Sequence, residues 1–160
     1  MFEFCQWLEQ TYVATAIRQS LWLFPAIETV HLLGMAFLVV TISAFDLRLL
    51  GLILRRASVS HLRRALLPWT WTAFAVQVVT GFLLFSSEAV KLFANPAFRL
   101  KLLLIVLAAI QVAIFHQLGL RNLPAWDTNP STPKAAKLAG FVSLVLWLSI
   151  AAAGRFIGFV

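Results

Sequence analysis

The chain of 160 residues is 61% hydrophobic and only 12% charged, about half the charged share of an average globular protein. Thirteen Lys and Arg against six Asp and Glu cannot cover the surface of a soluble domain, and the apolar residues come in blocks of about 20. We therefore expect a protein embedded in membrane lipid. The net charge of +7 is assigned to loops that face anionic lipid, not to nucleic-acid binding.

The first 20 residues are expected to lie along the membrane surface. Phe4, Trp7, Leu8 and Tyr12 recur at helical spacing, while Glu3, Glu9, Gln10 and Gln19 are polar. This pattern predicts an amphipathic interfacial helix over residues 1–20.

Four long apolar stretches follow, and each is long enough to cross a bilayer as a helix. An all-α fold is therefore predicted, an integral membrane four-helix bundle formed by residues 21–160. Pro68 is placed at the start of the second span, where its missing N–H costs little. The four spans are expected at about residues 26–46, 66–87, 102–120 and 138–154.

Basic residues near the span ends predict the orientation. The side with more Lys and Arg is expected in the cytoplasm, which places both termini in the periplasm. Eight basic residues fall on one side, namely Arg48, Arg55, Arg56, Arg63, Arg64, Arg121, Lys134 and Lys137. Five fall on the other, namely Arg18, Lys91, Arg99, Lys101 and Arg155.

An ionisable side chain inside a bilayer is costly, so each one marks a candidate site. Glu28 and His31 share one helix face near the outer boundary. Lys101 and Arg155 are expected at the same depth. We therefore predict a charge network in which Glu28 pairs with Lys101 or Arg155.

Two histidines within the spans share a local pattern, His31-Leu-Leu-Gly34 and His116-Gln-Leu-Gly119. A glycine one turn from a histidine leaves backbone accessible, so that a flat macrocycle or another helix can approach. Helix packing alone explains the pattern equally well. The third histidine, His61, lies among arginines at the cytoplasmic end of the second span.

Depth decides which histidines could share one haem. His116 and His61 both lie toward the cytoplasmic side, where Arg63 and Arg64 could pair with haem propionates. We therefore predict haem b with His116 as an axial ligand and His61 as its partner. His31 lies too far away and would serve a separate outer site, where Lys101 and Arg155 could hold propionates.

Short motifs spread over residues 20–160 carry a resemblance to a known family. The chain resembles small four-span bacterial membrane proteins known only as a domain of unknown function, and more loosely small membrane cytochromes b. The family resemblance implies a bacterial inner-membrane location and supplies no activity. The motifs are Glu28-Thr-Val-His31-Leu-Leu-Gly34, Asp46-Leu-Arg48-Leu-Leu-Gly51, Thr80-Gly81-Phe-Leu-Leu-Phe85, Phe98-Arg-Leu-Lys101, Phe115-His116 and Gly154-Arg155-Phe-Ile157.

Three functions stay open from the sequence. The leading hypothesis is a haem-b electron-transfer protein or redox-enzyme subunit that exchanges electrons with quinone or a redox partner protein. A second is a proton or small-solute pathway that starts at the outer charged residues and continues through Gln77, Gln111 and Asp46. A third is an accessory subunit without a cofactor. Copper handling is disfavoured, because the chain offers few soft ligands.

The small size of the chain also favours assembly. Four spans leave little room to enclose a cofactor or a pore. Gly140, Ser143 and Gly154 share a face of the fourth span with Trp147, which indicates a close helix contact there. We therefore expect a homo-oligomer.

Overall fold

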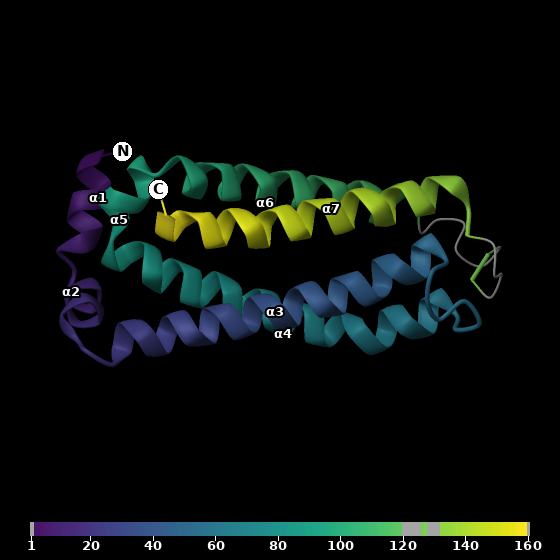
Figure 1. Cartoon of the computed structure of the whole chain (residues 1–160), viewed down its shortest axis with the longest axis horizontal. Coiled ribbons are helices and arrows are strands. Elements are labelled where there is room, and N and C mark those ends of the chain that lie inside the picture. Colours follow the sequence, from purple (N-terminus) through teal and green to yellow (C-terminus); the bar gives the residue numbers. More distant parts are fainter. Residues whose placement is uncertain (1, 120–125, 128–131, 160) are drawn as a thin grey trace.

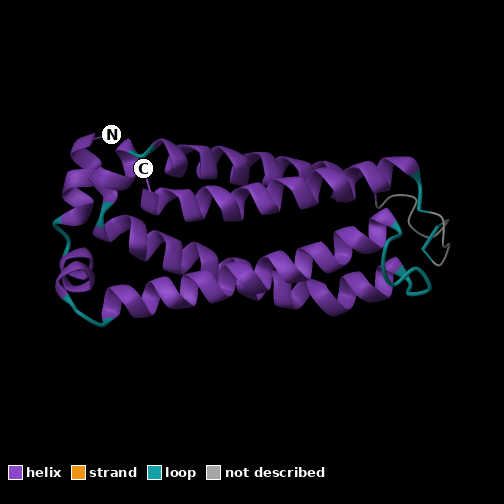
Figure 2. Ribbon diagram, viewed as in Figure 1, coloured by secondary structure: helices purple, strands orange, loops and turns teal. Residues whose placement is uncertain are grey.

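The computed structural model describes residues 2–119, 126–127 and 132–159, and this part of the chain is helical with no strands (Figure 2). Four of its helices are long and apolar enough to cross a membrane. The all-α class and the four spans predicted from the sequence are thus confirmed. The long helices are α3 (Leu23–Leu50), α4 (Val59–Ser87), α6 (Pro96–Ile114) and α7 (Lys134–Phe156).

The long helices form an open arrangement in place of a closed ring. Helix α3 packs against both α4 and α7, and α7 packs against α6, whereas α4 and α6 do not pack along their lengths. Figure 1 shows α3 crossing α4, with α6 and α7 side by side. Both termini lie at one end, here called the terminal end. The end of α3 and the start of α7 lie at the other, here called the loop end.

Capping residues set two helix starts that lie before the predicted ones. Ser58 accepts a hydrogen bond from the backbone N–H of His61, so α4 begins at Val59 and places Pro68 inside the helix. Asn95 accepts from the N–H groups of Ala97 and Phe98 and starts α6 at Pro96. The placement of Pro68 at a helix start is therefore corrected.

The N-terminal segment forms two short helices, not the single one expected. Helix α1 (Phe2–Glu9) ends before Thr11, whose hydroxyl caps α2 (Tyr12–Gln19). Cys5 and Leu8 pack on α5 (Ala89–Ala94), and Glu9 accepts a hydrogen bond from Val90 N at 2.8 Å. The two helices therefore cover the terminal end of the bundle while leaving aromatic side chains exposed, as an interfacial segment requires.

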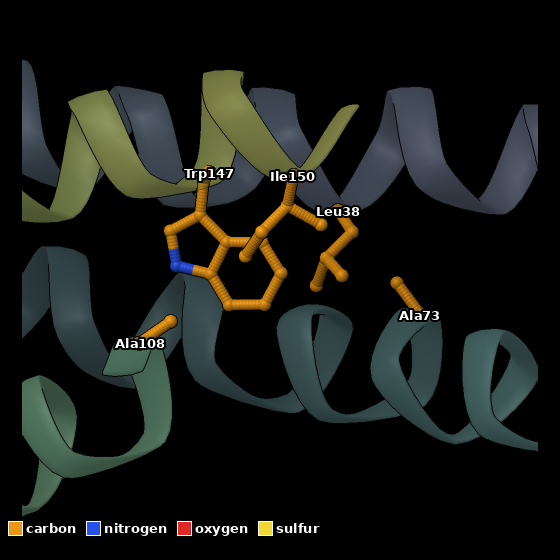
Figure 3. Close-up of a cluster of buried hydrophobic side chains, with 5 residues drawn as sticks. All are labelled: Leu38, Ala73, Ala108, Trp147 and Ile150. Atoms are coloured by element: carbon orange, nitrogen blue, oxygen red, sulfur yellow. The ribbon is translucent and has the colours of Figure 1, made fainter. Parts of the chain in front are cut away.

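Buried apolar side chains form a central layer of the bundle. Figure 3 shows Leu38 of α3, Ala73 of α4, Ala108 of α6, and Trp147 and Ile150 of α7 in one cluster. All four long helices contribute to it. This layer, here called the central cluster, separates the terminal half of the bundle from the loop half.

Candidate functional site

Polar side chains inside the bundle fall into two groups on either side of the central cluster. In α3, for example, Leu38 separates His31 from Asp46. Ala108 likewise separates Lys101 from Gln111 in α6. An apolar layer thus lies between the two parts of the polar route considered from the sequence.

His31 is the centre of the terminal group. Its Nδ1 lies 2.8 Å from the Thr80 hydroxyl, and its Nε2 lies 3.4 Å from Lys101 Nζ. Gln77 Nε2 donates to the His31 carbonyl oxygen at 2.6 Å. Side chains from α4 and α6 therefore hold the ring and backbone of one α3 residue.

Glycines allow this close packing. A Cβ at Gly81 would lie 3.2 Å from His31 Cε1, and one at Gly154 would lie 3.4 Å from Lys101 Nζ. Gly34, expected to expose backbone beside His31, instead faces Gln77: a Cβ there would lie 2.7 Å from Nε2. The glycine of the His31 motif thus serves a packing contact between α3 and α4.

The predicted ion pairs of Glu28 are not formed. Glu28 is exposed and has no ion pair among the described residues. Arg155 is also exposed and lies over the ring of Phe159, 5.4 Å from its centroid. Residues predicted at a similar depth in the membrane therefore do not pair with one another. Of Glu28, Lys101 and Arg155, only Lys101 contacts His31.

The loop half contains a cavity of about 520 Å³ between the four long helices. Its volume falls within the range typical of small-molecule and cofactor sites. Apolar residues make most of its wall, and Leu38, Ala108 and Trp147 of the central cluster border it. The polar side chains on the wall include Asp46, Arg63, Gln111, His116 and Ser143.

Four of these wall residues carry a buried polar atom without a hydrogen-bond partner. The atoms are Asp46 Oδ2, Arg63 Nε, Gln111 Oε1 and Trp147 Nε1. The sequence led us to expect a partner for the Trp147 N–H within the bundle, and none is present among the described residues. Each such atom costs about 1–3 kcal/mol. Because all four residues line one apolar cavity, we take it as the candidate binding site.

The two histidines predicted to share a haem differ in their position relative to the cavity. His116 lies in a π-helical turn (Phe115–Gly119) that continues α6, and it borders the cavity. Such turns are frequent at functional sites. His61 lies at the same end of the bundle, in the first turn of α4. Both histidines are exposed, but His61 does not border the cavity. The two histidines therefore do not flank one cavity.

The two arginines predicted to pair with haem propionates also differ in their position relative to the cavity. Arg63 borders the cavity, whereas Arg64 is exposed and does not. Gly119 is the last residue of the π-helical turn, and its surroundings lie outside the described residues. No group of three or more His, Cys, Asp or Glu side chains in the described part could hold a metal ion.

Sequence reasoning missed a buried arginine at the loop end. Arg48 was counted as a loop charge, yet it is fully buried. Its Nε donates to Ala57 O at 2.9 Å and its Nη1 to Thr132 Oγ1 at 3.4 Å. It thereby ties the end of α3 to the segment that precedes α7. Its position two residues after Asp46 in the last turn of a span was the available signal.

Asp127 makes a second contact at the loop end. Ser60 donates to its carboxylate through both Oγ and the backbone N–H, each at 2.6 Å, and these bonds hold the pKa of Asp127 below its ordinary value. Val59 N also donates to Asp127 O at 3.1 Å. Asp127 is thus held at the start of α4.

Four helices long and apolar enough to span a membrane, arranged around a partly polar cavity, define a small multi-span membrane protein. The chain belongs to DUF6644, a family of unknown function that matches residues 4–160. The family resemblance read from the sequence is confirmed. No curated protein and no solved structure matches the chain.

Proposed function

We propose that the protein binds an isoprenoid quinol in the loop-half cavity and acts as a membrane redox component. The observation that carries this proposal is that four residues with an unpartnered buried polar atom line one apolar cavity. Such a wall suits a molecule with a small polar ring and an apolar remainder.

The chemistry of the four atoms favours the reduced ring. Arg63 Nε and Trp147 Nε1 are donors, whereas Gln111 Oε1 is an acceptor and the Asp46 carboxyl oxygen can accept. A quinol hydroxyl both donates and accepts, so it can serve both kinds of atom. A quinone carbonyl only accepts and would leave Gln111 Oε1 without a partner. We therefore expect quinol to bind more tightly than quinone.

The open side of the bundle supports entry from lipid. Residues of α4 and α6 line the cavity, and these helices do not pack along their lengths. A head group on the polar wall could therefore leave its isoprenoid tail between α4 and α6, in contact with lipid. Phe85 of α4 and Phe98 of α6 stack at 5.3 Å near the terminal end, so helix contact is retained there.

Two glutamines offer a matched test. Gln111 and Gln77 each donate to a backbone carbonyl and each have an unpartnered Oε1, but only Gln111 borders the cavity. Titration of a short-chain ubiquinol into the protein in nanodiscs should show about three- to tenfold weaker binding for Gln111→Leu. Gln77→Leu should bind as the wild type does. Equal losses in both variants, or tighter binding of the quinone, would contradict the proposal.

Haem b is a second candidate for the same cavity, favoured by His116 and Arg63 on its wall. His116 would supply one axial ligand and Arg63 would pair with a propionate, which leaves the second axial position without a protein histidine. A Soret band in the purified protein supports this candidate. His116→Ala should then lose it, whereas His61→Ala and His31→Ala should keep it. A colourless preparation that yields quinone on solvent extraction supports the quinol proposal instead.

A further inference from the structure

We propose that Lys101 is a nucleophilic amine, activated by His31 and Thr80, that captures a membrane-soluble aldehyde as an imine. The three side chains come from three helices and form a nucleophile, a base and a group that orients the base. They lie on the terminal side of the central cluster. The proposal therefore does not depend on what occupies the loop-half cavity.

The hydrogen bonds of Thr80 determine which imidazole nitrogen carries the proton. The Thr80 hydroxyl donates to Val76 O at 2.6 Å, so its oxygen accepts the hydrogen of His31 Nδ1–H at 2.8 Å. The other ring nitrogen, Nε2, is then unprotonated in the neutral ring. Its lone pair is available to Lys101 Nζ at 3.4 Å. The ring is thus fixed in the tautomer that a base for Lys101 requires.

Lys101 has no carboxylate partner to hold it as an ammonium ion. No ion pair includes it among the described residues, and its hydrogen-bond partner is the His31 ring. Glu28, the acidic residue of α3 nearest in sequence to His31, is exposed and unpaired. An amine beside an unprotonated imidazole in an apolar setting can give up a proton more readily than one paired with a carboxylate.

Glycines fix the geometry without closing the site. Gly81 admits the His31 ring and Gly154 admits the Lys101 amine, as the short distances to their hypothetical Cβ atoms show. Both His31 and Lys101 remain partly exposed. A long-chain aldehyde dissolved in the bilayer could therefore place its carbonyl group beside the amine.

The reaction balances with these groups alone. Lys101 gives one proton to His31 Nε2, and the free amine attacks the carbonyl carbon. A second amine proton moves to the carbonyl oxygen, which becomes a hydroxyl group. That hydroxyl leaves as water with the proton returned by His31. Ammonium and aldehyde thus give a protonated imine and water, and His31 ends neutral.

Reductive trapping tests the site. The protein in nanodiscs is treated with hexadecanal and cyanoborohydride, and alkylation of each lysine is followed by peptide mass spectrometry. Lys101 should react at least about tenfold faster than exposed Lys91, because a positioned base typically contributes more than this factor. Labelling of Lys101 at or below the rate of Lys91 overturns the proposal.

Two variants separate activation from simple access. His31→Gln should lower the rate at Lys101 to that of Lys91 and leave Lys91 unchanged. Thr80→Val should give a smaller loss, since the ring stays but is no longer oriented. An unchanged Lys101 rate in His31→Gln refutes the role of the base. If either variant misfolds, as judged by its elution from size exclusion, the wild-type comparison of Lys101 with Lys91 still decides.

Discussion

Gly140 of α7 packs directly on the backbone of Asp46 in α3. A Cβ at position 140 would lie 3.0 Å from the Asp46 carbonyl oxygen and 3.1 Å from Leu49 Cβ. Backbone cannot move aside as a flexible side chain can. The contact therefore sets the spacing of α3 and α7 beside the loop-half cavity, which Asp46 and Leu49 line.

This contact predicts that Gly140→Ala destabilises the bundle. The added methyl group must separate α3 from α7, at a cost of about 1–3 kcal/mol. Thermal unfolding in detergent should show a lower Tm. Gly158→Ala is the matched control, because a Cβ at position 158 meets nothing within 4 Å, and its Tm should equal that of the wild type. Equal Tm values for all three proteins would show that the helices accommodate the methyl group.

The span positions could be predicted because they depend on composition. Twenty apolar residues require a helix in lipid whatever their neighbours are. Helix starts depend on single capping residues, and the sequence reasoning overlooked Ser58, so it placed the second span seven residues late, at Leu66 instead of Val59. The π-helical turn at His116 left no comparable signal in the sequence.

The side-chain pairings could not be predicted in the same way. Counting residues along a span gives depth, but it leaves the rotation of each helix and the choice of neighbours undetermined. Depth correctly placed His61 and His116 at one end, yet only His116 borders the cavity. Lys101 was correctly recognised as a notable charge, but its partner proved to be His31 and not Glu28.

Exposure of Glu28 gives a prediction opposite to the one drawn from the sequence. Because Glu28 has no ion pair in the described part, Glu28→Gln should change the free energy of unfolding by no more than about 0.5 kcal/mol. Thermal unfolding of the purified variant measures this. A large fall in Tm would show that Glu28 gains a partner in the membrane.

Asp127 predicts an acid-sensitive contact at the loop end. Since hydrogen bonds from Ser60 hold its pKa below the ordinary value, ionised Asp127 stabilises the fold above about pH 4. This contribution is lost as the pH falls through the lowered pKa. Asp127→Asn lacks the ionised form, so its Tm should fall less than that of the wild type between pH 7 and pH 3. Identical falls would exclude Asp127 as a source of the acid sensitivity.

The last prediction concerns orientation. The larger number of Lys and Arg residues assigned to the loop end predicts that this end faces the cytoplasm and that the termini face the periplasm of a bacterial inner membrane. Native Cys5 is a poor probe, because it is only 3% exposed. In a Cys5→Ala background, Tyr12→Cys and Arg56→Cys place thiols at two exposed sites, one at each end. After the outer membrane is permeabilised, an impermeant maleimide should label Tyr12→Cys in intact cells and Arg56→Cys only after lysis. The reverse pattern would invert the orientation.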